Sequence, residues 1–97
     1  MDEDPDDAFT IYAIALEYLA IDEQKAIEYF ELLAQKNPEY IGTYYQLGAL
    51  CQKIGNIVEA ENTYKKGIEM ALIAKDQHAL AELRSALSNM LLGLEED

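Results

Sequence analysis

Apolar residues recur every three or four positions along most of the chain, with short polar breaks between the periodic runs. This spacing places apolar side chains on one face of an α-helix. The pattern therefore predicts an all-α protein of about five helices. The expected ranges are 5–20, 22–37, 41–54, 57–74 and 77–94.

The first two expected helices are bounded by familiar local signals. Asp4-Pro5 pairs a capping side chain with a proline that fits the first helical turn, so it predicts the start of the first helix. Asp22 is the expected N-cap of the second helix. Asn37-Pro38 should end that helix, because a proline disfavours helical geometry in the residue before it.

The later boundaries depend on one glycine and three polar residues. Gly55 suits the left-handed position that often follows a helix, and it predicts the end of the third helix. Asn56 with Glu59 resembles a capping box at the start of the fourth. Asp76 is the expected N-cap of the fifth, although neither glycine nor proline enforces this last turn.

The chain also repeats itself. Segment 26–33 recurs at 60–67, an offset of 60 − 26 = 34 residues. Segment 9–16, with Phe9 and Leu16 in its key positions, matches 44–51 at an offset of 44 − 9 = 35 residues. We therefore expect the first unit to carry one extra residue in its turn.

Gly48 stands inside the apolar third helix, where glycine costs about 1 kcal/mol relative to alanine. If the third and fourth helices form an antiparallel pair, the small residues Gly48 and Ala60 allow a close approach between them. Packing then offsets the cost of the glycine.

The second unit resembles the tetratricopeptide repeat pattern through Tyr44, Leu47, Gly48, Cys51, Ala60, Tyr64 and Gly67. The first unit is similar but looser, and Pro38 falls on the closing proline of the family. The resemblance implies one right-handed α-solenoid domain over residues 1–97, with repeats at about 5–38 and 41–74 and a capping helix at about 77–94. The chain also resembles small stand-alone tetratricopeptide proteins of bacteria.

In this family the first helix of each repeat lines a concave groove that receives a peptide or a helix of another protein. The residues that would line it here are Thr10, Ile11, Ile14, Glu17, Tyr18, Tyr45, Gln46, Ala49, Gln52 and Lys53, together with Glu82, Ser85, Ser88 and Asn89 of the last helix. An alternative stays open, in which Tyr18 and Tyr45 are ordinary surface aromatics. The family's groove for chaperone tails needs lysine and asparagine donors, which Thr10, Ile14 and Gln46 do not supply.

The formal charge of −12 lies mostly at the two ends, with five acids in residues 2–7 and three in 95–97. Without clustered lysine and arginine, nucleic acid and anionic membrane are poor partners, whereas a neutral or basic protein suits the chain. No apolar run approaches the ~18 residues that suggest a membrane span. The acidic start differs from a basic targeting signal, so we expect a cytoplasmic protein.

The chemistry-bearing residues are too few and too scattered to predict an enzyme. Cys51 and His78 are the sole cysteine and the sole histidine, and Cys51 falls on the expected buried face. We expect no cofactor and no metal. A second function stays open besides protein binding: a homodimer through the fifth helix, where Leu92 lies off the main apolar stripe.

Overall fold

The structure is a computed structural model that describes residues 7–95. It contains the helices α1 (Ala8–Tyr18), α2 (Glu23–Lys36), α3 (Gly42–Lys53), α4 (Ile57–Ala74) and α5 (Gln77–Glu95). The all-α fold expected from the apolar periodicity is confirmed.

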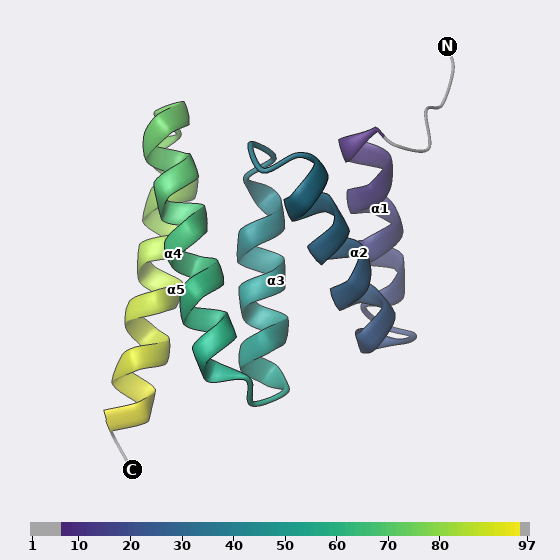
Figure 1. The fold of residues 1–97 in the computed structure, drawn as a ribbon. Helices are drawn as coiled ribbons and strands as arrows, with labels where there is room; N and C mark the ends of the chain where they lie inside the picture. Colours follow the sequence, from purple (N-terminus) through teal and green to yellow (C-terminus); the bar gives the residue numbers. More distant parts are fainter. Residues whose placement is uncertain (1–6, 96–97) are drawn as a thin grey trace.

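The helices stack side by side into an elongated body of 50 × 33 × 18 Å (Figure 1). Each helix packs against the next one in sequence, and α3 also contacts α5. In the view of Figure 1, α2 and α4 lie on the near side with α3 between them, while α5 passes behind α4. The body therefore has one broad face that carries α2 and α4, and an opposite face to which α3 and α5 contribute.

Aspartate caps begin three of the helices. The carboxylate of Asp22 accepts a hydrogen bond from the backbone N–H of Lys25 at 3.2 Å, and Asp76 accepts one from Ala79 at 3.0 Å, which confirms both expected caps. At the first helix the expected start was wrong. Asp7 caps α1, which begins at Ala8, and Asp4-Pro5 lies outside the described residues.

The turn between α3 and α4 departs from the expected capping box. Gly55 adopts the left-handed conformation, with φ of +88°, as expected. The backbone N–H of Asn56 then donates to the carbonyl of Cys51 at 2.8 Å and closes the end of α3. The Asn56 side chain makes no cap hydrogen bond. Its backbone N–H already donates to Cys51, so the Glu59 carboxylate cannot accept that hydrogen as it would in a capping box. Glu59 is therefore available for contacts elsewhere.

These two turns provide a matched test of capping. We expect Asp22→Ala to lower the free energy of unfolding by about 1 kcal/mol, since it removes the hydrogen bond to the N–H of Lys25. Asn56→Ala removes no such bond and should cost clearly less. Urea unfolding followed by circular dichroism measures both variants, and equal losses would contradict the difference in capping.

The core runs through the stack from α1 to α5. Its fully buried or nearly buried side chains include Ala15, Ala26, Phe30, Leu33, Tyr44, Leu47, Cys51, Ala60, Tyr64, Leu83 and Met90. Tyr44 also donates its hydroxyl hydrogen to the carbonyl of Pro38 at 2.6 Å, which ties α3 to the turn before it. Both expected repeat units thus contribute to one continuous core.

Two glycines of this core lie against aromatic residues. A Cβ atom at Gly48 would stand 2.5 Å from the ring of Tyr64, and one at Gly67 would stand 2.5 Å from the Cβ of Tyr44. Atoms cannot approach this closely, so α3 and α4 pack only because these positions lack side chains. The expected close approach at Gly48 is present, and the Tyr64 ring is its nearest neighbour.

The expected register of α1 was wrong. Phe9 and Leu16, assigned to core positions from the sequence, are 66% and 38% exposed, whereas Ile11 and Ala15 are buried. Ile11 and Ala15 match Tyr44 and Gly48 of α3 at an offset of 44 − 11 = 33 residues. The small residues Ala15 and Ala26 of the first unit are 26 − 15 = 11 positions apart, whereas Gly48 and Ala60 of the second are 60 − 48 = 12 positions apart. The first unit therefore has one residue fewer between them.

The last helix, α5, is only partly covered. Leu80, Leu83 and Met90 are buried against the stack, while Leu94 is 53% exposed. Leu92 is 54% exposed, as its position off the stripe predicted. The C-terminal end of α5 therefore presents apolar surface to solvent.

Candidate concave site

A cleft of about 350 Å³ lies between α3 and α5. Its single α3 residue is Tyr45, which is 40% exposed. The other lining residues come from α5 and are His78, Ala81, Glu82, Ser85, Ala86 and Asn89. An exposed aromatic ring beside small and polar side chains offers apolar contact and hydrogen bonds in one place.

The i, i+4 spacing along α5 explains the composition of this cleft. His78, Glu82 and Ala86 follow one another by four residues, so they share one side of the helix. Leu83 lies on another side and is buried in the core. The alanines in the lining leave room beside Tyr45 that longer side chains would fill.

A second hollow of about 380 Å³ joins three parts of the chain that are far apart in sequence. Its lining residues are Tyr12, Glu39, Tyr40, Ile41, Gly42 and Asp76. The rings of Tyr12 and Tyr40 are 5.3 Å apart. A Cβ added at Gly42 would be 3.5 Å from the Tyr12 ring, an ordinary contact, so this glycine is not required by a close approach.

The electrostatics of both hollows are acidic. Three carboxylates line them, those of Glu39, Asp76 and Glu82, and no lysine or arginine is among the described lining residues. The Glu82 carboxylate lies 3.1 Å from Nε2 of His78, which is charged only when protonated. These surfaces therefore favour a neutral or basic partner.

The structure separates the candidate residues of α3 into two groups. Tyr45 and Ala49 are exposed, and Gln46 donates to the hydroxyl of Tyr12 at 3.4 Å, which places Gln46 between α1 and α3. Gln52 instead accepts a hydrogen bond from Tyr64 of α4 at 3.3 Å.

Lys53, the last α3 candidate, forms an ion pair with Glu23 in the first turn of α2. Lys53 thus contacts α2 and Gln52 contacts α4, rather than α1 or α5. The helices α2 and α4 are each the second helix of a repeat. Neither residue lines the cleft beside Tyr45.

The candidates on α1 lie differently from expected because of the register error. Ile11 is only 3% exposed, and the Tyr18 ring stacks on Tyr29 of α2 at a centroid distance of 5.6 Å. Ile14 is half-buried, while Glu17 is exposed. Ile11 and Tyr18 therefore belong to the packing of the first unit.

With the corrected offset, different α1 residues correspond to the exposed ones of α3. Tyr45 and Ala49 match Tyr12 and Leu16, since 45 − 12 = 33 and 49 − 16 = 33. The hydrogen bond from Gln46 to Tyr12 is consistent with this placement. Tyr12 is half-buried, since its ring packs against Phe30 at a centroid distance of 5.9 Å, and it also lines the second hollow.

The residues with catalytic potential do not form a catalytic arrangement. Cys51 is buried, and burial, with smaller contributions from Glu59 and Glu31, raises the pKa of its thiol. A raised pKa keeps the thiol protonated and poorly nucleophilic. The side chain of His78 is 85% exposed on α5, and no hydrogen bond joins it to Cys51 in the described chain. Within residues 7–95, no three acidic, histidine or cysteine side chains gather to hold a metal ion.

Two solved structures closely match this arrangement of helices. The solution NMR structure of a tetratricopeptide repeat domain protein from Salinibacter ruber is 42% identical in sequence, with a TM-score of 0.88, and the match covers 98% of this chain and 96% of that one. The chain belongs to the tetratricopeptide repeat family. A crystal structure of a tetratricopeptide repeat domain protein from the same organism is 40% identical, with a TM-score of 0.82, over 87% of this chain and 96% of that one.

Other comparisons add no more specific relative. Neither a scan of known family profiles nor a search of curated proteins finds a match. Of the described helices, none is both long enough and apolar enough to cross a bilayer. The match to tetratricopeptide repeat domain proteins supports a helical repeat fold of the kind used in protein interaction.

Proposed function

We propose that this tetratricopeptide protein is a non-catalytic interaction module whose concave face binds a peptide or a helix of another protein. The supporting observation is the cleft beside Tyr45, which combines an exposed aromatic ring with polar groups from α5. Tyrosine contributes a large contact area with little loss of conformational entropy, so it is a suitable anchor. The proposed partner is neutral or basic and is neither nucleic acid nor membrane, and the proposed compartment is the cytoplasm.

Peptide selection followed by NMR mapping tests this proposal. Peptides are selected from a random library displayed on phage against the full chain. The best binder is then titrated into ¹⁵N-labelled protein. We expect the largest amide shifts at Tyr45, Ala49 and the cleft residues of α5. Shifts confined to α2 and α4 would contradict the proposed face.

A second proposal is self-association through α5. It is favoured by the apolar surface at the C-terminal end of that helix, where Leu91, Leu92 and Leu94 are 37%, 54% and 53% exposed. Three exposed leucines within one helical turn are more than a single scattered surface residue, and such patches often mark interfaces. Burying them between two copies would give a symmetric dimer.

Under this second proposal the wild type sediments as a dimer and Leu92→Lys shifts it to a monomer, because a lysine cannot be buried unpaired in an apolar interface. Leu72→Lys is the matched control, since Leu72 is 52% exposed but lies near the other end of the α4–α5 hairpin. Analytical ultracentrifugation measures all three proteins. A wild type that remains monomeric at high concentration would exclude the dimer.

A further inference from the structure

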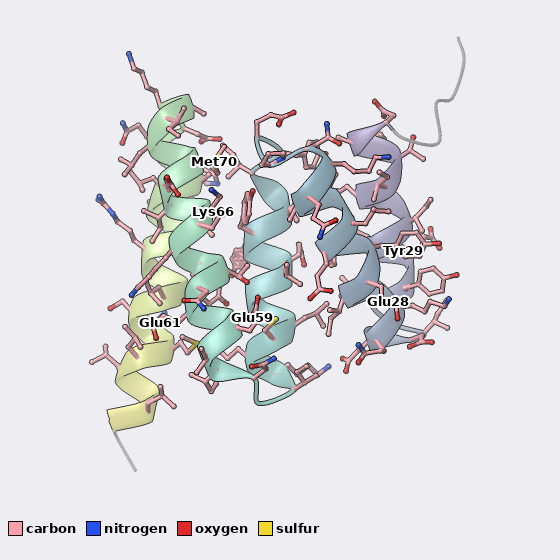
Figure 2. All side chains as sticks on the ribbon, in the orientation of Figure 1. Glu28, Tyr29, Glu59, Glu61, Lys66 and Met70 are labelled. Atoms are coloured by element: carbon pink, nitrogen blue, oxygen red, sulfur yellow. The ribbon has the colours of Figure 1, made fainter. Side chains whose placement is uncertain are left out.

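A larger cleft, of about 450 Å³, opens between α2 and α4 and is separate from the cleft that Tyr45 lines. Its walls are formed by these two helices and its floor by α3. The lining residues are Glu31, Ala34 and Gln35 of α2, Tyr44 and Leu47 of α3, and Glu59, Asn62, Thr63 and Lys66 of α4. Figure 2 views this face directly, with Glu59 and Lys66 labelled along the α4 wall.

The floor and the walls differ in chemistry. Tyr44 and Leu47 provide an apolar floor, and both belong to the packed core. Above it, the amides of Gln35 and Asn62 stand on opposite walls, and neither makes a hydrogen bond to another described residue. Carboxamides that face each other across an apolar floor can hold the polar backbone of an extended chain.

The two acidic residues of the cleft lack the partners that neighbouring acids have. Glu61 and Glu69 on α4 form ion pairs with lysines, and Glu69 pairs with Lys66 of the cleft at 3.5 Å. By contrast, Glu31 and Glu59 form no ion pair in the part of the chain that the structure describes.

Both carboxylates also act on one buried group of α3. Burial is the main cause of the raised pKa of the Cys51 thiol, and Glu59 and Glu31 each add to it, so the negative potentials of the two carboxylates overlap at α3. A cation placed between the two walls is attracted by both, and the attraction at short range exceeds that of either alone.

We propose that the α2–α4 cleft binds an extended segment of another protein that carries an arginine, with the guanidinium between Glu31 and Glu59. The planar guanidinium donates several hydrogen bonds at once and can engage two carboxylates. Its methylene groups pack over the apolar floor while Gln35 and Asn62 bond to the backbone of the segment. The acidic segments 2–7 and 95–97 contain no arginine or lysine, and the net charge of −12 attracts a basic partner.

The probe for this site is a blocked nonapeptide of serine and glycine with one central arginine, titrated into the ¹⁵N-labelled full chain. The same peptide with citrulline is its neutral counterpart. We expect the arginine peptide to shift the amides of residues 31–35 and 59–66 in a saturable way. The citrulline peptide should produce no saturable shift.

Four glutamate-to-glutamine variants test whether peptide binding requires the two carboxylates of the cleft. Glu31→Gln and Glu59→Gln should each weaken binding about fivefold, as expected when one ion pair is lost at a partly exposed site. The controls Glu28→Gln and Glu61→Gln remove the same charge from the same two helices outside the cleft lining, and they should leave the affinity unchanged (Figure 2). Tyr45→Ala should also have no effect, because Tyr45 lines a different cleft.

Four results would overturn the proposal. One is the absence of saturable shifts at millimolar peptide. Another is equal weakening by all four glutamine variants, which would show diffuse attraction to an acidic surface. The third is a set of shifts on α5 that Tyr45→Ala abolishes, which would place the arginine on the concave face. Self-association would appear as shifts that depend on protein concentration without peptide, and it would also overturn the assignment.

Discussion

Tyr64→Ala is expected to lower the free energy of unfolding by about 3–5 kcal/mol, the range for truncation of a buried aromatic residue. The Tyr64 side chain is 2% exposed, and its ring fills the space against Gly48. Truncation leaves a cavity between α3 and α4 and also removes the hydrogen bond from the Tyr64 hydroxyl to Gln52. Both losses occur at the contact between α3 and α4.

Urea unfolding followed by circular dichroism measures this loss. Tyr45→Ala is the matched control, because it makes the same chemical change at a residue that is 40% exposed. We expect the control to cost less than about 1 kcal/mol. Tyr64→Phe separates the hydroxyl from the ring and should cost about 1 kcal/mol. Equal losses for the two alanine variants would contradict the packing described for Tyr64.

Gly48→Leu is expected to destabilise the protein by about 1–3 kcal/mol through overpacking. Even the first atom of a new side chain would lie 2.5 Å from the Tyr64 ring, so the ring or a helix must move. Gly93→Leu is the control, since a Cβ at Gly93 meets no atom within 4 Å. That variant should not lose stability, because leucine favours a helix more than glycine does.

Combining the two changes tests whether Gly48 and Tyr64 form one packing unit. Removal of the Tyr64 ring creates the space that a leucine at Gly48 requires. The double variant Gly48→Leu, Tyr64→Ala should therefore lose less stability than the sum of the two single losses. Strict additivity in the same urea experiment would show that the leucine is accommodated elsewhere.

The sequence predicted those features of the fold that depend on local chemistry. Asp22 and Asp76 cap helices through their own side chains, and Gly55 is the residue type best suited to a left-handed turn. Each of these interactions spans only a few residues. The family resemblance of the second repeat was confirmed because its aromatic and small residues stand at the spacing that packing requires.

The register of α1 could not be predicted because the helix is apolar on nearly every side. Its sequence, AFTIYAIALEY, offers an apolar residue in several alternative registers. Only packing decides that Ile11 and Ala15 are buried while Phe9 is exposed. The error moved the candidate groove residues of the first repeat onto Ile11 and Tyr18, which pack internally.

The α2–α4 cleft was hidden for a related reason. In the sequence, Glu31, Glu59 and Asn62 look like ordinary surface residues of two separate helices. Their relation depends on the spacing of α2 and α4 across α3, which no local pattern encodes. The turn at Asn56 also mattered, since the Asn56 N–H donates to Cys51 rather than to the Glu59 carboxylate, and Glu59 lines the cleft instead.

The measurement to make on the concave face is the dissociation constant of the selected peptide for three proteins, by isothermal titration calorimetry. These are the wild type, Tyr45→Ala and Tyr29→Ala, where Tyr29 lies on α2 outside the cleft of Tyr45 (Figure 2). We expect Tyr45→Ala to weaken binding by about tenfold or more, as for an anchoring aromatic residue, and Tyr29→Ala to leave it unchanged. Unchanged affinity for Tyr45→Ala, or an equal loss for both variants, would contradict binding at the concave face.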